Sequence, residues 1–487
     1  MSVHMFQKNI HKKRNMRNFT FKGLFLTAVF TLLGCLSIQA ADDDLITKQI
    51  TIKLDEAGTL PDRIGASKKY LITNLKIIGK INGTDWKMIR EMVGRDYENN
   101  KTAGKLSMLD LSEAKIVKGG DRYFSGYFSG YYSGDNCYTS NDEIGECAFK
   151  DCSRLTSLTL PAGITSIGYA AFNGCHGLTS LTLPAGITSI GRSAFCGCSR
   201  LTSLTLPAGI TSIGRSTFEG CRGLTSLTLP AGITSIGGGA FKDCSGLTSL
   251  TLPAGITSIN YGTFYGCSGL TSLNLPAGIT SIDYNAFYGC SGLTSLTLPA
   301  GITSIGEDTF YGCSGLTSLT LPAGITSIGE YAFSGCSGLT SLNLPAGITS
   351  IDKYAFSGCS RLTSLTLPAG ITSIGEFAFS YCSGLTSIYV YAEKVPRIGR
   401  YAFEGCASRK CTLYVPKGTY DNYRLSEFGY FENIVEFDAT GIDKTTTSTD
   451  VEEVSRYSLN GQRLAVPVKG LNIVKYSDGT ARKVVVK

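Results

Sequence analysis

Cysteine is the residue whose number and spacing could most readily support chemistry in this chain. Seventeen of its 487 residues are cysteines, and most of them recur at intervals of 23 residues. Cysteines in such number can form disulfides, bind a metal ion or act as nucleophiles. The regularly spaced set consists of Cys152, Cys175, Cys198, Cys221, Cys244, Cys267, Cys290, Cys313, Cys336, Cys359 and Cys382.

The spacing of the cysteines belongs to a 23-residue repeat that begins near residue 144. One unit, which starts at Ile167, reads IGYAAFNGCHGLTSLTLPAGITS. The alternation at residues 158–160 predicts a short strand, and Pro161 ends it because proline has no amide hydrogen. Ile164 and Ile167 add a second apolar pair, and the segment from Ala171 to Cys175 is expected to form a short helical turn. One unit cannot close a core but stacked units can, so the predicted fold is a repeat solenoid.

In such a stack the regularly spaced cysteines are expected to form a ladder of buried small hydrophobic residues. Neighbouring rungs lie about 4.8 Å apart, but parallel side chains hold their Cβ atoms farther apart than a disulfide favours. A straight row also lacks the convergence that metal ligands need. Cys196 and Cys411 lie outside the row, and a local disulfide between Cys406 and Cys411 stays an alternative.

The residues that would have to assist a nucleophile are scarce. Of the three histidines, His4 and His11 lie at or before the expected signal segment. His176 occupies a turn position that holds serine or arginine in other units, which is typical of a surface substitution. Without a histidine base, thiol or serine catalysis lacks its second member. The adjacent Glu307 and Asp308 are typical of a solvated turn, so we expect no catalytic residue, no metal site and no cofactor.

The repeat pattern LxxLxLP…ITSIG…AFxxC resembles the leucine-rich repeats of BspA-like bacterial surface proteins, over about residues 144–416. The segment before it resembles the irregular first coils of such arrays, with a helix expected at Met88–Met92 and a strand at Leu106–Leu111. The resemblance implies a β-rich leucine-rich repeat solenoid of short strands and short helical turns. It also implies adhesion to host matrix or plasma proteins, such as fibronectin and fibrinogen, or to other bacterial cells.

The formal net charge of +7 belongs to the N-terminus and not to a nucleic-acid-binding surface. Residues 1–40 carry six of the 45 lysines and arginines and no acid, which leaves 39 basic against 38 acidic residues. A basic cluster, an apolar stretch and a cleavage site at Ala40 predict a secretory signal at residues 1–40. A lipid anchor at Cys35 is an alternative. We therefore expect a secreted or outer-surface protein that binds no nucleic acid.

The C-terminus is expected to form a separate β module that follows a Thr/Ser-rich linker. Residues 455–487 read as short strands with hairpin turns at Asn460-Gly461 and Asp478-Gly479. This segment resembles the C-terminal sorting domain of type IX secretion cargo, which implies contact with export and sorting machinery. The expected organisation is a signal at 1–40, an irregular cap region at 41–140, the solenoid and its C-terminal cap at 141–437, a linker at 438–454 and the module at 455–487.

The positions that differ among near-identical units are the candidate binding residues. They lie mainly after Ile-Gly and beside the cysteine, and they place exposed aromatic and charged side chains on one ridge. The tyrosines are Tyr261, Tyr265, Tyr284, Tyr288, Tyr311, Tyr331 and Tyr354, with Phe377 in phase with the last two. The arginines are Arg192, Arg200, Arg215 and Arg222. Later units carry the acids Asp243, Asp283, Glu307, Asp308, Glu330 and Asp352.

These features predict a non-catalytic extracellular binding protein, most simply an adhesin. Two other functions stay open. One is a passive structural surface coat, in which the tyrosines only shield the edge of the coils. The other is an ice- or glycan-binding ladder of hydroxyl groups on the strand face, at the positions equivalent to Ser157 and Thr159.

Overall fold

The computed structural model describes residues 45–126 and 136–439, and residues 453–457, 463–464, 466, 469–476 and 481–486 of the C-terminal module. The expected signal segment with Cys35, residues 127–135 and the two expected C-terminal turns lie outside the described residues.

Three parallel strands and two helices form the N-terminal end of the array. The strands β1 (Ile50–Leu54), β2 (Asn74–Ile81) and β3 (Met108–Ile116) are connected by α1 (Leu60–Ile64) and α2 (Gly83–Val93), and β3 pairs onward with β7 (Ser157–Thr159). A short antiparallel pair, β4 (Gly119–Phe124) and β5 (Cys137–Thr139), follows. The predicted helix at Met88–Met92 is confirmed as part of α2, and the strand predicted at Leu106–Leu111 begins two residues later, at Met108, in β3.

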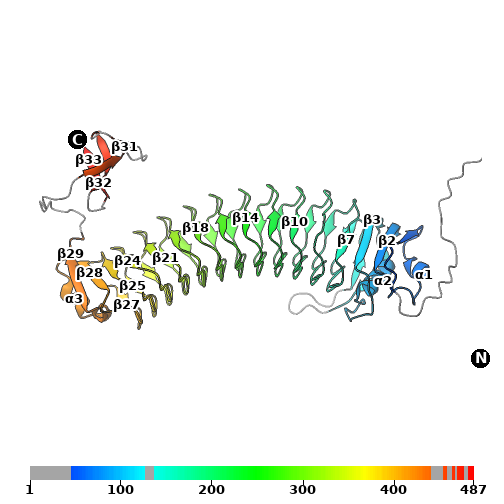
Figure 1. Ribbon diagram of the computed structural model, residues 1–487, viewed down its shortest axis with the longest axis horizontal. Coiled ribbons are helices and arrows are strands. Elements are labelled where there is room, and N and C mark those ends of the chain that lie inside the picture. Colours follow the sequence, from blue (N-terminus) through cyan, green and yellow to red (C-terminus); the bar gives the residue numbers. More distant parts are fainter. Residues whose placement is uncertain are drawn as a thin grey trace, which may run out of the picture. The chain divides into compact units, whose positions relative to one another are not determined.

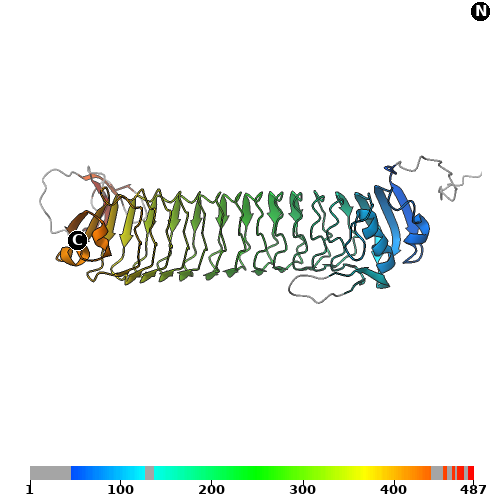
Figure 2. The same ribbon diagram turned by 90° about the horizontal axis from the view of Figure 1, so that it is seen from below.

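The repeat then forms a solenoid in which each coil adds two short parallel strands, except that the coil at Ser180 and Thr182 has only isolated bridges in the first row (Figures 1 and 2). The first row continues from β7 with β10 (Ser203–Thr205), β12 (Ser226–Thr228), β14 (Ser249–Thr251), β16 (Ser272–Asn274), β18 (Ser295–Thr297), β20 (Ser318–Thr320), β22 (Ser341–Asn343), β24 (Ser364–Leu367), β26 (Ser387–Val390) and β28 (Thr412–Pro416). The second row has β6 (Glu143–Ile144), β8 (Ser166–Ile167), β9 (Ser189–Ile190), β11 (Ser212–Ile213), β13 (Ser235–Ile236), β15 (Ser258–Ile259), β17 (Ser281–Ile282), β19 (Ser304–Ile305), β21 (Ser327–Ile328), β23 (Ser350–Ile351), β25 (Ser373–Ile374) and β27 (Arg397–Ile398). The predicted repeat solenoid is confirmed.

The segment from Ala171 to Cys175 is not helical, which corrects the expected helical turn. Its amides alternate between two kinds of acceptor. The Cys175 N–H donates within the coil to the Phe172 carbonyl at 3.1 Å, whereas the Phe172 N–H donates to Ala194 of the next coil at 2.7 Å. An α-helix would need each amide to reach the carbonyl four residues earlier. Because every second amide bonds the next coil, the segment forms linked turns instead.

A ladder of phenylalanines fills the core behind these turns. From Phe149 to Phe403, successive rings lie 5.1–5.7 Å apart between centroids and 1–11° from parallel. The rings are fully or almost fully buried. Stacked rings at this spacing gain both burial and aromatic contact.

The regularly spaced cysteines lie in the same core and are hydrogen-bond donors as well as apolar fillers. From Cys175 onward, and at Cys406, each Sγ donates to the carbonyl of the preceding coil's phenylalanine at 3.0–3.4 Å. The regularly spaced cysteines are free thiols, and so are Cys406 and Cys411, so the local disulfide considered for that pair is absent. Burial raises the pKa of Cys244 and of Cys313 to about 12, which keeps these thiols protonated as donors.

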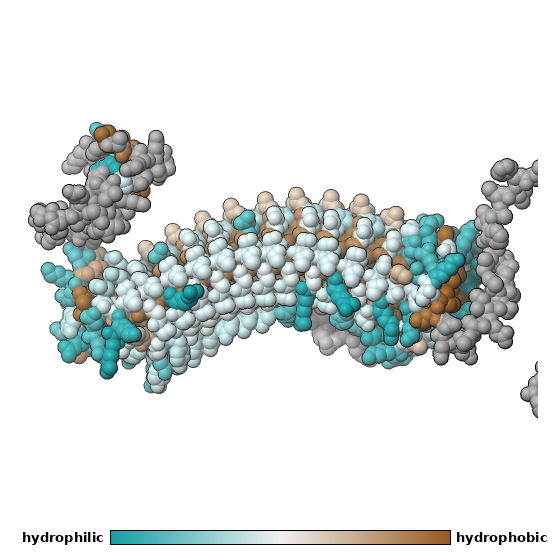
Figure 3. Space-filling model, in the orientation of Figure 1, coloured by the Kyte–Doolittle hydropathy of each residue, from teal (hydrophilic) through white to brown (hydrophobic). Residues whose placement is uncertain are grey.

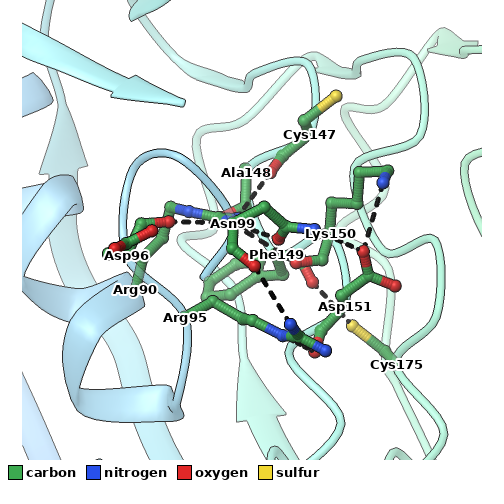
Figure 4. Close-up of polar contacts among 10 residues, drawn as sticks. All are labelled: Arg90, Arg95, Asp96, Asn99, Cys147, Ala148, Phe149, Lys150, Asp151 and Cys175. Carbon is green, nitrogen blue, oxygen red and sulfur yellow. Dashed lines mark hydrogen bonds and ion pairs between the residues drawn. The ribbon is translucent and has the colours of Figure 1, made fainter. Parts of the chain in front are cut away.

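The first coil has no preceding coil to bond its turn carbonyls, and side chains of α2 and the loop after it take that role (Figure 4). The Trp86 indole donates to Ala148 at 3.1 Å, and Arg90 donates to Cys147 at 2.8 Å and to Ala148 at 3.1 Å. Arg95 donates to the Asp151 carbonyl at 3.1 Å. The Trp86 ring also packs on Phe149, with 5.3 Å between centroids. These side chains cap the solenoid.

At the other end, the last coil is covered by β29 (Asn433–Phe437), α3 (Tyr420–Arg424) and a 3-10 helix at Glu427–Tyr430. Phe428 and Phe431 pack on Phe403, with ring centroids 5.5 and 5.3 Å away. The Tyr430 hydroxyl donates to the Cys406 carbonyl at 2.7 Å. The aromatic ladder therefore ends against aromatic side chains and not against water.

The C-terminal module is an antiparallel sheet in the order β31-β30-β32-β33. Its strands are β30 (Glu453–Tyr457), β31 (Arg463–Leu464), β32 (Gly470–Tyr476) and β33 (Ala481–Val486). This agrees with the predicted small all-β module.

The N-terminal cap makes a first prediction. Replacing Arg90→Met should lower the free energy of unfolding by about 3 kcal/mol, because it leaves several buried carbonyls without a donor. Trp86 is the single tryptophan of the chain, so its fluorescence during urea unfolding reports the cap directly. The control is Arg63→Met on α1, an exposed arginine, which should leave the transition unchanged. Equal stability of the two variants would contradict the capping role of Arg90.

The thiol ladder makes a second prediction, on pH dependence. Burial raises the pKa of the Cys221, Cys244 and Cys267 thiols above the unfolded value near 9, so the unfolded chain loses these protons first as the pH rises. Stability should be full below pH 9 and then fall by about 1 kcal/mol per pH unit for each thiol. Urea unfolding between pH 7 and 11 measures the slope. Replacing Cys221, Cys244 and Cys267 by alanine should make it shallower, and an unchanged slope would refute the assignment.

Candidate functional site

The variable positions of the repeat lie together on the turn that follows the second-row strand. Counted from the isoleucine that begins each unit, they are the third, fourth and seventh residues, for example Tyr169, Ala170 and Asn173. The fourth residue has a positive φ, between 50° and 62°, in every unit from Ala170 to Tyr401. The seventh residue directly follows the buried phenylalanine. All three positions therefore form columns along one edge of the solenoid.

Aromatic side chains from two of these columns join into one continuous row, here named the aromatic strip. The strip consists of Tyr265, Tyr288, Tyr311, Tyr331, Tyr354, Phe377 and Tyr401. Centroids of Tyr265, Tyr288 and Tyr311 are 4.5 and 4.6 Å apart, and those of Tyr331, Tyr354 and Phe377 are 4.7 and 4.8 Å apart. An edge contact of 6.4 Å between Tyr311 and Tyr331 connects the two stacks. In the sequence these residues occupy two different positions of the repeat unit, and the structure brings their rings into one row.

The second half of the strip is built on unfavourable backbone geometry. Tyr331, Tyr354, Phe377 and Tyr401 have φ values of 54–60°, in the left-handed region. This region costs an L-residue with a Cβ atom about 1–2 kcal/mol. Earlier coils place Gly239 and Gly262 at the same position without that cost. Large aromatic side chains here are therefore not needed by the fold.

Most rings of the strip are half-buried, because each covers the face of its neighbour. Burial, followed by the neighbouring Tyr265 and Tyr311, raises the pKa of the Tyr288 hydroxyl. Burial likewise raises the pKa of Tyr331. What the strip offers to a partner is consequently a line of ring edges and neutral hydroxyl groups.

A second tyrosine pair lies beside the strip and contacts an arginine. Tyr261 and Tyr284 stack with 5.5 Å between centroids, and the guanidinium of Arg215 lies 5.1 Å above the Tyr261 ring. The Tyr261 ring occupies the space where Gly238 of the preceding coil has no side chain, since a Cβ there would come within 2.3 Å of the ring. The missing side chain at Gly238 thus allows Tyr261 to reach Arg215 across two coils.

The other predicted arginines are exposed, and the acids follow them along the edge. Arg192 lies in the same column as Arg215, whereas Arg200 and Arg222 lie on the turn after the cysteine. Burial, with Glu307 and Glu330 nearby, raises the pKa of Asp308. Strongly hydrophilic residues are sparse over the middle coils and more frequent towards the two ends of the array (Figure 3).

Sequence reasoning missed two parts of the aromatic surface. Tyr401 extends the strip, with its ring 5.1 Å from Phe377, but the last unit runs one residue out of step and hid it. On the strand face, Tyr389 and Tyr414 stack at 4.4 Å where earlier coils carry threonine. Alignment of the repeat units past residue 382 would have placed both tyrosines at the threonine position and so would have shown this second cluster.

The strand face otherwise presents hydroxyl groups, and part of them are used inside the protein. Threonines of the LTS segment donate to the same residue of the preceding coil, as Thr294 does to the Thr271 carbonyl at 3.3 Å. The outer side chains such as Thr297 and Thr320 remain exposed. The row of coils bends, and the first-row sheet is interrupted after β12 and β16, so this face is not one flat lattice (Figure 1).

The residues that the structure describes contain no group of three or more histidine, cysteine or acidic side chains arranged to hold a metal ion. None of their helices has the length and apolar character to cross a membrane.

Comparison with known proteins identifies the repeat. A model of the BspA type leucine-rich repeat region matches residues 136–247, 211–319, 234–361 and 303–423, together more than half of the chain. No curated protein matches the chain.

Three solved structures are similar to it. A leucine-rich repeat protein from Bacteroides ovatus is 23% identical, with a TM-score of 0.51 and coverage of 80% of this chain and 92% of that one. A leucine-rich cell surface protein from Faecalibacterium prausnitzii is 28% identical, with a TM-score of 0.37 and coverage of 54% and 85%. The pneumococcal vaccine antigen PcpA is 21% identical, with a TM-score of 0.41 and coverage of 61% and 78%. The first likeness shows a shared fold, and the family match shows that the chain belongs to the BspA-type leucine-rich repeat family.

Proposed function

We propose that this protein is a non-catalytic binding protein of the cell surface or the extracellular medium, which adheres to other proteins through the aromatic strip. The observation that carries the proposal is the joining of seven aromatic residues from successive coils into one row. Tyrosine is enriched where proteins dock, because it combines a large apolar ring with a hydroxyl group. The secretory signal and the C-terminal sorting-type module would deliver the chain to the surface.

The geometry of the strip favours a protein partner over a sugar. The rings stack face to face at 4.5–4.8 Å within each half of the strip, so their faces are already occupied. Stacking on a sugar ring needs a free aromatic face. Ring edges and hydroxyls, in contrast, match the mixture of apolar contacts and hydrogen bonds at protein interfaces. The interrupted and bent strand face gives little support to an ice- or glycan-binding hydroxyl ladder.

The passive-coat alternative explains the strip less well. A coat needs only a stable solenoid, and glycine at the positive-φ position serves this purpose in two coils. Aromatic residues occupy that position in four successive units despite the conformational cost. Every unit has this backbone conformation, and alanine or serine occupies the position in three earlier units, so the fold sets the conformation but does not require an aromatic side chain there.

The third prediction tests the strip with the host proteins that the family resemblance implies. Immobilised fibronectin and fibrinogen should bind the purified protein. Replacing Tyr265, Tyr288 and Tyr311 together by serine should weaken binding at least tenfold, since each interface aromatic contributes about 1–2 kcal/mol. Serine is the matched choice because the array itself has Ser334 and Ser357 at this position.

The control is the pair Thr297→Ala and Thr320→Ala on the exposed strand face, which should bind as the wild type does. Circular dichroism would verify that both variants fold. If the threonine changes abolish binding and the tyrosine changes do not, the site lies on the strand face. Absence of wild-type binding to both proteins and to bacterial cells would refute the adhesin proposal.

A further inference from the structure

The third residue of successive units forms a column of charges with an unusual order. We name it the charge column, and from the third regular unit onward it reads Arg192, Arg215, Gly238, Tyr261, Tyr284, Glu307 and Glu330. The amide of each fourth residue donates to the carbonyl of the third residue one coil later, as Ser193 does to Arg215 and Asp308 to Glu330, so equivalent residues follow one another by one coil spacing of about 4.8 Å. The column is therefore a regular series of two cations, a glycine that the Tyr261 ring covers, two tyrosines and two anions.

This order is complementary to its own reversal. When a second column runs antiparallel and the two are centred on Tyr261, Arg192 faces Glu330 and Arg215 faces Glu307. At the centre, Tyr284 faces Gly238, and Tyr261 faces its own copy. A two-fold axis requires a surface that is self-complementary in this way, in which residue i meets j and j meets i. The same charges in a random order would bring like charges together.

The four charged groups of the column are not neutralised within the chain. Among the residues that the structure describes, the ion pairs do not include Arg192, Arg215, Glu307 or Glu330. Arg192, Arg215 and Glu307 are exposed and Glu330 is half-buried. The contact with the Tyr261 ring holds the Arg215 guanidinium in place, which reduces the entropy lost on pairing.

Two lysines near the column are paired within the chain. Lys242 pairs with Glu219 at 3.1 Å, and Lys353, the next residue of the column after Glu330, pairs with Glu376 at 3.4 Å. Asp308 lies next to Glu307 and would add a further anion opposite Arg215. The charged groups of the column itself are therefore available to a second copy.

We propose that two copies of this protein associate antiparallel through the charge column, about a two-fold axis at Tyr261. Four ion pairs, two of Arg192 with Glu330 and two of Arg215 with Glu307, join the copies on either side of a tyrosine centre. The association is independent of matrix binding and leaves the later part of the aromatic strip, from Tyr331 to Tyr401, outside the column. Because exposed ion pairs are individually weak, the association is expected to be reversible and sensitive to salt.

Charge reversal provides the experiment, with sedimentation velocity of the full chain as the measurement. The wild type should show a dimer that grows with concentration and dissociates as sodium chloride is raised from 0.05 to about 0.5 M, where the Debye length falls to a few ångströms. The double variant Arg192→Glu with Arg215→Glu should be monomeric, because it places four acids opposite four acids. The double variant Glu307→Arg with Glu330→Arg should be monomeric for the converse reason.

Mixing the two double variants distinguishes pairing from damage to the fold. Each is repelled by its own copy, but each presents the charges that the other needs, so an equimolar mixture should form a heterodimer. The matched control is Arg200→Glu with Arg222→Glu, which reverses two exposed arginines of neighbouring coils outside the column and should leave the dimer intact. A monomeric wild type, or a mixture that stays monomeric while both variants are folded, would overturn the proposal.

These outcomes are separable from those of the adhesion test. Fibronectin and fibrinogen binding is measured with the tyrosine variants, and self-association is measured in the absence of either protein. A protein that dimerises without binding them, or binds them as a monomer, would retain one proposal and lose the other.

Discussion

The structure depends on the hydrogen bonds that the turn amides of one coil donate to the carbonyls of the next. Phe172 donates to Ala194, and Phe195 donates to Thr217 in the same way one coil later. Because the donors of these turn hydrogen bonds belong to the earlier coil, whereas amides after the second-row strands, such as that of Gly191, donate back to it, the array has a direction and its two ends differ chemically. The first coil presents carbonyls without donors, which is why its cap is rich in N–H groups from Trp86, Arg90 and Arg95.

The same constraint accounts for the cysteines. The carbonyl of each phenylalanine accepts two hydrogen bonds. One comes from the cysteine amide in its own coil, and the other comes from the cysteine thiol of the next coil. Phe172, for example, accepts from the Cys175 amide at 3.1 Å and from the Cys198 thiol at 3.2 Å. A small apolar side chain that can also donate a weak hydrogen bond fits this buried position. Metal binding and disulfide formation are not needed to explain the ladder.

Much of this architecture follows from the period of 23 residues. Units too small to close a core must stack, and the alternation of leucines and threonines places a strand before each proline. The hydrogen-bond pattern of the turn does not follow from this period, because no local sequence pattern shows that every second amide donates to the next coil. For this reason a helical turn was expected at Ala171 to Cys175. The Arg90 cap was equally hidden, since its partners are backbone carbonyls near residue 148, which have no sequence signature.

The candidate surface was predictable as a set of residues but not as an arrangement. The tyrosines were recognisable because they depart from otherwise identical units. Their connection depended on the side-chain directions at the fourth and seventh positions, which allow Tyr311 to meet Tyr331 across two columns. Tyr401 was obscured by a single inserted residue, which shifts the sequence lattice while the phenylalanine ladder continues through Phe403 without a break.

A repeat lattice gives sequence order a direct spatial meaning. In most folds, residues 23 positions apart have no fixed relation, whereas here they are neighbours along one edge. The order of substitutions at one position of the repeat is therefore the order of side chains along a line. The chain after residue 40 is nearly neutral overall, yet its third-residue positions from Arg192 to Glu330 separate cations from anions along that edge. Net charge consequently says little about how such a protein interacts with others. The order of charges within one column determines which surfaces that column can face.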